Sequence, residues 1–267
     1  MRLEFAKMHG CGNDYIYIDG FRADPPADPV ALARRLSDRH FAVGSDGLVY
    51  VEKSTRASAR MRMWNADGSE AEMCGNAIRC VAKLVFERGH VKERTFPIET
   101  ASGVLDVTVE TEGDRVVRAR VAMGAPRVFE DAEVAVGGTR VRGTIVSMGN
   151  PHFVILDEKL DDARVKGLGP LVERHERFPK RTNVEFVRVE SPRLLRARVW
   201  ERGSGETLAC GTGACAILAA ARSAGRAGDK ATVALPGGEL ECDWPGGHGT
   251  IYLSGPCELA FEGAVEI

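Results

Sequence analysis

The feature that most constrains the fold of this chain is an internal repeat at one fixed spacing. Four residues recur 136 positions further along, in the pairs Trp64 and Trp200, Glu70 and Glu206, Cys74 and Cys210, and Gly75 and Gly211. The apolar stretches LVYV (48–51) and VEFV (184–187) keep the same spacing. Several matches at one offset without a gap are the signature of a repeated structural unit. We therefore expect two copies of one fold.

The same order of elements is predicted in each copy. The expected ranges are a strand at 15–18 or 152–156, a polar helix at 29–39 or 169–177, strands at 48–51 and 61–64 or 184–189 and 197–200, and a helix after the cysteine at 75–88 or 212–223. A further strand with clear alternation is expected at 104–110. Strands dominate, and the helices after the cysteines are the most apolar. We therefore predict an α+β protein with two pseudo-symmetric domains, each a mostly antiparallel β-sheet or barrel wrapped around a central helix.

The expected domain boundaries follow from the repeat. The first domain is predicted at 1–120 and the second at 121–258, with a last strand at about 259–267 that returns to the first domain.

Composition and charge exclude several classes of function. The chain has 267 residues and a formal net charge of −2, so it lacks the basic excess that binds a nucleic-acid backbone. Its longest apolar run, 214–221, is too short to cross a membrane, and the first residues lack the apolar core of a signal peptide. We therefore expect a cytoplasmic protein whose seven cysteines stay reduced, with neither nucleic acid nor membrane as a partner. A homodimer is left open.

The cysteine spacing argues against a metal site. Cys74 and Cys80 are separated by five residues and Cys210 and Cys215 by four, unlike the shorter spacing typical of zinc knuckles. No metal ligand is assigned. Several of the other cysteines are interpreted as small buried apolar residues, namely Cys80, Cys215, Cys242 and Cys257, and the role of Cys11 is left open.

Cys74 and Cys210 differ from the rest because a glycine and a predicted helix follow each of them. The free N–H groups and the dipole at a helix start stabilise a thiolate, so we expect a lowered pKa for both thiols. The same N–H groups can bind a carboxylate. In a pseudo-two-fold protein the two helix starts can face each other. Two unrelated capping cysteines are the alternative, but that leaves the matched spacing unexplained.

Two acid/base groups on opposite faces of one carbon are what inversion of a stereocentre requires. One thiolate removes the α-proton while the other thiol delivers a proton to the opposite face. Donors at the helix starts can hold the charge of the intermediate. A pyridoxal enzyme would need a Schiff-base lysine and a phosphate cup, and no segment indicates either. We therefore expect no cofactor.

Five segments carry a resemblance to a known family: MHGCGNDY, WNADGSEAEMCGNAIRC, GNPH, TNVEF and ERGSGETLACGTGACA. In this order and along the whole chain they closely resemble diaminopimelate epimerase. The resemblance implies a pyridoxal-phosphate-independent isomerase that interconverts LL- and meso-2,6-diaminopimelate in lysine and peptidoglycan-precursor biosynthesis. It makes Cys210 the proton acceptor and Cys74 the proton donor in the direction from LL to meso.

The resemblance also implies a set of substrate contacts. Backbone N–H groups for the reacting carboxylate come from Gly75, Asn76, Gly211 and Thr212, and the anchoring side chains are Asn13, Asn65, Asn150, Asn183, Glu201 and Arg202. His152 and Glu201 are expected to orient the reacting amine and tune the thiols. Arg202 can bind the distal carboxylate in bidentate fashion. Taken singly, these residues also fit structural roles, as turn asparagines, a core histidine and a surface ion pair.

The chain departs from the family pattern at Gly47, where some relatives carry a glutamine that reaches the substrate. Cys11 and Cys257 also depart from the family pattern, because relatives often have apolar residues at these two positions. Three alternatives are kept. Proline racemase-like enzymes have a histidine after the first Cys-Gly, where this chain has Asn76. Phenazine-biosynthesis isomerases lack the cysteine pair, and a non-catalytic amino-acid-binding protein would not need it.

Overall fold

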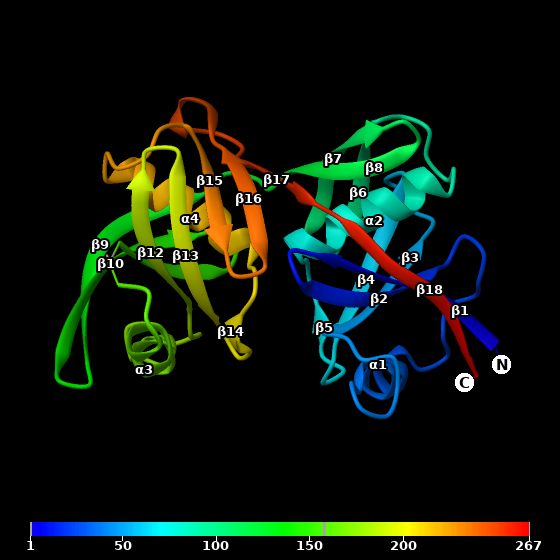
Figure 1. Ribbon diagram of the computed structural model, residues 1–267, viewed down its shortest axis with the longest axis horizontal. Coiled ribbons are helices and arrows are strands. Elements are labelled where there is room, and N and C mark those ends of the chain that lie inside the picture. Colours follow the sequence, from blue (N-terminus) through cyan, green and yellow to red (C-terminus); the bar gives the residue numbers. More distant parts are fainter. Residues whose placement is uncertain (1, 157–158, 267) are drawn as a thin grey trace. The chain divides into compact units, whose positions relative to one another are not determined.

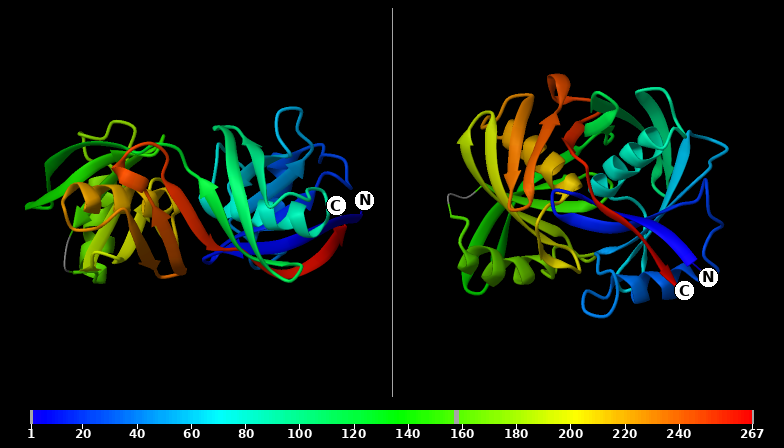
Figure 2. Two further views of the ribbon diagram at one scale, coloured as in Figure 1. Left: turned by 90° about the horizontal axis from the view of Figure 1, so that it is seen from above. Right: turned by 45° about the vertical axis from the view of Figure 1, so that its right-hand side comes forward.

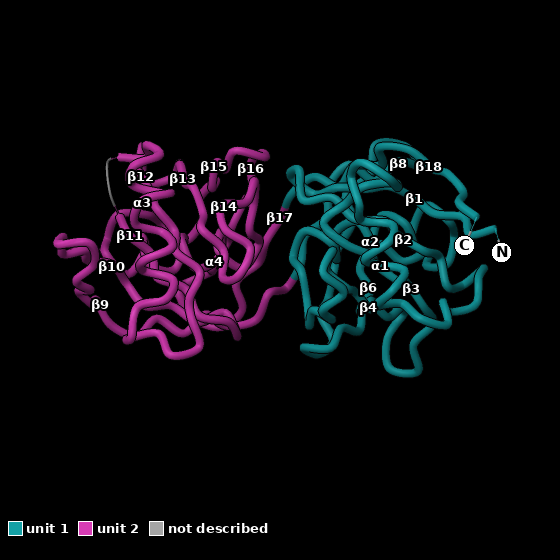
Figure 3. Tube along the Cα trace, turned by 90° about the horizontal axis from the view of Figure 1, so that it is seen from below, with its two compact units in different colours: residues 1–121, 255–267 teal, residues 122–254 magenta. Residues whose placement is uncertain are grey.

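The computed structural model describes residues 2–156 and 159–266 (Figure 1). The chain has a mixed α+β fold, and its described residues form eighteen strands and four α-helices. Two compact units result: unit 1 contains residues 1–121 and 255–267, and unit 2 contains residues 122–254 (Figure 3). None of the described helices is long and apolar enough to span a membrane.

Unit 1 is a mostly antiparallel set of strands around one buried helix. Its elements are β1 (Arg2–Gly10), β2 (Asn13–Asp19), α1 (Pro29–Ser37), β3 (Gly47–Glu52), β4 (Ala59–Asn65), β5 (Glu70–Ala71), α2 (Gly75–Glu87), β6 (Thr95–Thr100), β7 (Gly103–Glu112), β8 (Arg115–Ala122) and β18 (Glu258–Glu266). Helix α2 is buried from Gly75 to Val85 and contacts β1, β2, β4 and β7. The pairs β2–β3 and β4–β6 are parallel.

The two terminal strands of unit 1 lie side by side. Strand β18 pairs with β1 in antiparallel register, from Arg2 opposite Glu266 to His9 opposite Glu258 (Figure 2). The last segment of the chain therefore completes the sheet begun by the first segment.

Unit 2 repeats this arrangement. Its elements are β9 (Arg127–Val136), β10 (Thr139–Ser147), β11 (Pro151–Leu156), α3 (Asp162–Glu173), β12 (Asn183–Ser191), β13 (Leu194–Glu201), β14 (Gly205–Thr207), α4 (Gly211–Ser223), β15 (Lys230–Leu235), β16 (Gly238–Asp243), a 3-10 turn (Pro245–Gly247) and β17 (Tyr252–Pro256), which ends past the unit boundary. Small residues let α4 lie buried from Gly213 to Ala221 against β10, β11, β12, β15 and β16. Here β11–β12 and β13–β15 are the parallel pairs.

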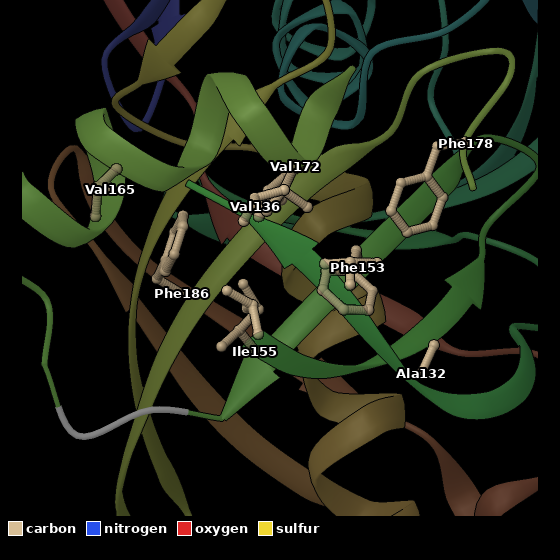
Figure 4. Packing of buried hydrophobic residues seen from close by; sticks show 11 residues of the cluster. Ala132, Val136, Phe153, Ile155, Val165, Val172, Phe178 and Phe186 are labelled. Atoms are coloured by element: carbon tan, nitrogen blue, oxygen red, sulfur yellow. The ribbon is translucent and has the colours of Figure 1, made fainter. Parts of the chain in front are cut away.

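A second apolar layer in unit 2 lies beneath α3. Val165 and Val172 of the helix pack with Phe153, Phe178 and Phe186 in one buried cluster (Figure 4). Burying such side chains contributes roughly 1.5–3 kcal/mol each. This layer fixes α3 against the strands that carry the candidate site residues.

The strand register confirms the repeat seen in the sequence. Trp64 lies opposite Leu48 in unit 1, and Trp200 lies opposite Val184 in unit 2. The same correspondence places Tyr15 beside Gly47 and His152 beside Asn183. The paired strands around these residues therefore correspond between the two units.

One predicted helix was misplaced. The sequence analysis placed it at 169–177, but α3 begins at Asp162 and ends at Glu173. The Asp161 side chain caps the helix by accepting a hydrogen bond from the Arg164 N–H at 2.9 Å. Pro170 lies inside the helix, where the apolar packing of α3 holds it despite the lost hydrogen bond.

A buried carboxylate ties β2 of unit 1 to the segment after α2. Asp19 accepts hydrogen bonds from Arg88 Nη1 and His90 Nε2, each at 2.9 Å. Burial by itself would raise the pKa of Asp19, but the hydrogen bonds from His90 and Arg88 outweigh it and leave the pKa below its ordinary value. This cluster is a source of pH-dependent stability.

Candidate functional site

Cys74 is the N-cap residue of α2. Its backbone is extended, and its Sγ accepts a hydrogen bond from the Ala77 N–H at 3.5 Å. A cap residue leaves the first N–H groups of the helix available for other acceptors. The glycine that follows is the first helical residue, so no bulky side chain stands at the helix start.

Cys210 occupies the matching place in unit 2. It is the N-cap of α4, and its Sγ accepts a hydrogen bond from the Gly213 N–H at 3.4 Å. Both helices begin at the glycine after the cysteine: α2 starts at its predicted residue, and α4 starts one residue before the predicted 212. Each unit therefore presents a thiol beside N–H groups that suit a carboxylate.

In unit 1 the Cys74 thiol is held by an asparagine. Its Sγ donates to Asn13 Oδ1 at 3.2 Å, and Asn76 Nδ2 donates to the same oxygen at 3.4 Å. Asn13 Nδ2 donates to Asp46 Oδ2 at 2.8 Å, which fixes the orientation of the amide. The Cys74 sulfur therefore has an amide oxygen as acceptor in addition to the Ala77 N–H as donor. Asp46 was missed by the sequence analysis, and its place in a glycine-bounded loop gave no signal.

Asn76 has a second partner within unit 1. It is almost fully buried, and its Oδ1 accepts from Arg79 Nη2 at 3.0 Å. Its side chain therefore organises the helix start, and its backbone N–H is the group suited to a ligand. Asn65 lies at the end of β4, half-buried, with its Nδ2 donating to Ser69 Oγ at 3.0 Å.

Gly47 is required by its neighbours in unit 1. A Cβ at this position would lie 2.1 Å from the Trp64 carbonyl oxygen and 2.9 Å from Tyr15 Cε1. These distances leave no room for any side chain. The packing of β2, β3 and β4 therefore requires glycine at the position where some relatives carry a glutamine.

In unit 2 a chain of polar contacts leads to Cys210. It runs from Glu185 Oε1 to His152 Nδ1 at 2.6 Å, from His152 Nε2 to Asn150 Oδ1 at 3.0 Å, from Asn150 Nδ2 to Thr212 Oγ1 at 3.2 Å, and from Thr212 Oγ1 to Cys210 Sγ at 3.6 Å. His152 and Glu185 are fully buried. The sequence analysis missed Glu185. The signal for it was a glutamate in an apolar strand, at the position that Val49 occupies in the other repeat.

Glu201 lies beside the same thiol. Thr207 Oγ1 donates to Glu201 Oε1 at 2.5 Å. Loss of water around the carboxyl group raises the pKa of Glu201, although hydrogen bonds from Thr207 and Cys210 act in the opposite direction. A carboxylate with a raised pKa, in contact with a thiol, is suited to accept that thiol's proton.

The expected lowering of the pKa of Cys210 was wrong. Burial raises the pKa of this thiol well above its ordinary value, and the charges of Glu201 and Glu185 add to that effect. Hydrogen bonds from Thr212 and the Gly213 N–H oppose the rise without reversing it. The helix start is therefore outweighed by desolvation and by two nearby carboxyl groups. Cys210 is therefore a protonated thiol, and a base must take its proton before it can act as a thiolate.

Asn183 and Arg202 form a separate pair in unit 2. Asn183 Oδ1 accepts from the Arg202 backbone N–H at 2.8 Å, and Asn183 Nδ2 donates to the Pro151 carbonyl oxygen at 3.2 Å. The Arg202 side chain is exposed, with Nη1 donating to the Lys180 carbonyl oxygen at 3.4 Å. Asn183 thus positions the backbone from which the guanidinium extends.

The structure brings the predicted site residues together in two groups, one in each unit. Asn13, Cys74 and Asn76 are in mutual contact in unit 1, and the other group contains Cys210, Thr212, Asn150, His152 and Glu201 in unit 2. Asn65, Asn183 and Arg202 lie outside these contacts. Across residues 2–156 and 159–266, no group of three or more His, Cys, Asp and Glu is arranged to hold a metal ion.

The comparisons with known proteins agree on one family. A family model described as diaminopimelate epimerase matches residues 5–129 and 144–260. A diaminopimelate epimerase from Methanococcus maripaludis is 45% identical over 278 residues, covering 99% of this chain and 100% of that protein. Another from Desulforudis audaxviator is 49% identical over 275 residues, covering 98% of each chain.

Similar solved structures establish the fold. A phenazine biosynthesis protein of the PhzF family from Bacillus anthracis has a TM-score of 0.78 at 16% identity, with 100% of both chains covered. A hydroxyproline epimerase from Agrobacterium vitis has a TM-score of 0.75 at 18% identity, covering 99% of this chain and 92% of that one. At such identities the likeness concerns the fold alone.

Proposed function

We propose that this chain, which belongs to the diaminopimelate epimerase family, interconverts LL- and meso-2,6-diaminopimelate by proton transfer between two cysteines. The observation that carries the proposal is the matched pair of N-cap thiols, Cys74 and Cys210, each followed by a glycine at a helix start. Epimerisation of one carbon needs one proton carrier for each face. A pseudo-two-fold repeat supplies two such carriers.

The first step in the direction from LL to meso uses Cys210. Its thiol passes a proton to the Glu201 carboxylate, with which it shares a hydrogen bond. The resulting thiolate removes the α-proton of the substrate, and the electron pair of the C–H bond moves toward the α-carboxylate. The raised pKa of Cys210, caused first by burial and then by the charge of Glu201, makes this thiolate a strong base once formed.

The second step uses Cys74. Its S–H bond, held toward Asn13 Oδ1, breaks as a C–H bond forms on the opposite face of the planar intermediate. The product then leaves with Cys74 as thiolate, Cys210 as thiol and Glu201 protonated. Glu201 then loses its proton to solvent and Cys74 takes one up, which restores the starting state. The reverse reaction exchanges the roles.

The charge of the intermediate falls on the reacting carboxylate. We assign its binding to the N–H groups of Gly75, Asn76, Gly211 and Thr212 at the two helix starts. Removal of a single preorganised donor of this kind costs roughly 100- to 1000-fold in rate in other enzymes. These donors take the place that an imine cofactor would have.

The distal head of the substrate needs its own anchors. The exposed guanidinium of Arg202 can hold the distal carboxylate through two parallel hydrogen bonds, and Asn183 fixes the Arg202 backbone. Asn65 at the end of β4 and Asn150, which contacts Thr212 at the start of α4, each offer an amide group that can donate and accept. The cytoplasm suits this chemistry because two catalytic thiols must stay reduced.

A coupled assay tests the proposal. The purified protein is given LL-diaminopimelate, L-proline or L-glutamate without pyridoxal phosphate, and formation of the epimer is measured. We expect turnover of diaminopimelate alone. Turnover of L-proline at a higher rate would favour a proline racemase-like enzyme, and turnover of none would favour a binding protein.

A further inference from the structure

One buried carboxyl group in unit 2 has no part in the proposed proton transfers. Glu185 on β12 is fully buried, and its Oε1 lies 2.6 Å from His152 Nδ1. Its Oε2 has no hydrogen-bond partner among the described residues. A charged carboxylate with one unpartnered oxygen is costly in a protein interior. Burial raises the pKa of Glu185, which likewise favours the uncharged carboxyl group. The neutral acid, donating its proton to His152 Nδ1, avoids that cost, and in this form Glu185 does not contribute the negative charge that would raise the pKa of Cys210.

The proton on Glu185 sets the direction of every later hydrogen bond. His152 accepts at Nδ1, so its own proton is on Nε2 and is donated to Asn150 Oδ1. The Asn150 amide then donates from Nδ2 to Thr212 Oγ1. Because the Thr212 oxygen accepts from Asn150, its hydroxyl proton is left for the Cys210 sulfur, 3.6 Å away. A hydroxyl aimed at the sulfur stabilises the thiolate.

Gly213 makes room for this arrangement at the start of α4. A Cβ there would lie 3.1 Å from Glu185 Oε1 and 3.2 Å from Cys210 Sγ. The carboxyl group and the sulfur are thus both packed against the same backbone position.

Unit 1 has other residue types at the matching positions. The counterparts of Glu185, His152 and Gly213 are Val49, Tyr15 and Ala77. The sulfur of Cys74 instead faces an acceptor, Asn13 Oδ1. The Cys210 sulfur therefore has the Thr212 hydroxyl beside it, at the place where the Cys74 sulfur has the amide oxygen of Asn13.

We propose that Glu185 is a positioning residue that acts through His152, Asn150 and Thr212 to aim a hydroxyl proton at the Cys210 sulfur and so assist its ionisation. The catalytic role of Glu185 rests on the proposed function, whereas its effect on the ionisation of Cys210 does not. The titratable groups that face Cys210 are Glu201 from β13 and Glu185 from β12, and His152 from β11 faces Glu185.

Alkylation of the two thiols tests the proposal without substrate. The full-length protein is treated with iodoacetamide between pH 6 and 10, and the modification of Cys210 and Cys74 is followed by peptide mass spectrometry. The thiolate is the reacting species, so the rate reports ionisation. In Glu185→Leu we expect Cys210 to react about tenfold more slowly at a pH below its midpoint, as for loss of one hydrogen bond to a charged group. Cys74 is the internal control and should be unchanged.

Three variants separate the proposal from a merely structural role. Glu185→Gln can still donate to His152 Nδ1, so its Cys210 rate should lie within about twofold of the wild type. Thr212→Val should reproduce the Glu185→Leu effect. In the double variant the two effects should fail to add, because both act through the same hydroxyl. Circular dichroism checks that each variant is folded.

Several results would overturn the proposal. Faster alkylation of Cys210 in Glu185→Leu would mean that Glu185 is a charge that opposes ionisation. A slowed Glu185→Gln, additive effects, or equal slowing of Cys74 would also contradict it. If the alkylation results hold but no diaminopimelate is turned over, the proposed function fails while this inference stands.

Discussion

Substitution of Gly47 by alanine provides a sharp test of how unit 1 is packed. A Cβ would lie 2.1 Å from the Trp64 carbonyl oxygen, 2.9 Å from Tyr15 Cε1 and 3.0 Å from Asn65 Cα. The nearest of these atoms belongs to the backbone of β4, which pairs with β3 at this point. No flexible side-chain end can move aside, so the two strands must separate.

The size of the effect follows from these distances. The carbonyl oxygen has to recede from 2.1 Å to at least 3.0 Å. Overpacking of this kind costs roughly 1–3 kcal/mol, and the stiffer unfolded chain returns roughly 0.4–1 kcal/mol. We therefore expect Gly47→Ala to lower the free energy of unfolding by about 1–2 kcal/mol. Because Asn65 lies opposite Gly47, the displacement should also raise KM for diaminopimelate.

Urea denaturation of Gly47→Ala and of a matched control measures this. Gly167 lies on the exposed side of α3, and a Cβ there would meet no atom within 4 Å. Gly167→Ala should therefore stabilise the protein by roughly 0.5–1 kcal/mol. Replacement of glycine by alanine should therefore lower the free energy of unfolding at position 47 and raise it at position 167. A Gly47→Ala protein as stable as the wild type, with unchanged KM, would refute the packing argument.

Three further predictions concern charged residues. Arg202→Ala should raise KM for diaminopimelate at least tenfold and weaken discrimination against substrates without a distal carboxylate, as measured by steady-state kinetics; Arg202→Lys, which keeps only a point charge, should fall in between. Glu201→Gln should make Cys210 react faster with iodoacetamide near pH 8, because a charge that raises its pKa is gone, yet slow epimerisation; a parallel change in both rates would contradict the assigned base. Asp19→Asn should lower the free energy of unfolding by about 2 kcal/mol at pH 7. Since the folded-state pKa of Asp19 is depressed, this difference is present above its unfolded value near 4 and should shrink as the pH falls through the folded value; a difference that grows in acid would show that the sign is wrong.

The sequence was informative wherever local pattern determines structure. The repeat predicted matching registers around Trp64 and Trp200, and both cysteine-capped helices begin within one residue of their predicted starts. N-caps and strand alternation depend on neighbours in the chain, so they can be read without a structure. The start of α3 was not found in this way, although the Asp161 side chain caps the helix and Pro170 lies inside it.

Properties that depend on burial lay beyond the sequence. The raised pKa of Cys210 arises from desolvation and from Glu201 and Glu185, which lie far from it in the chain or on another strand. The contact of Asn13 with Asp46 likewise joins two loops. The sequence around Cys210 indicated the helix dipole but not the surrounding carboxyl groups. The predicted direction of its pKa shift was wrong for this reason.

Isotope labelling shows whether two thiols serve opposite faces of one carbon. The protein is incubated with unlabelled LL-diaminopimelate in deuterium oxide, and both isomers are separated and analysed by mass spectrometry at low conversion. We expect one deuterium at the inverted carbon of the meso product, because Cys74 has exchanged with solvent, while the remaining LL substrate stays unlabelled. Deuterium entering the LL substrate as fast as the meso product forms would mean that one group serves both faces, and would contradict the account.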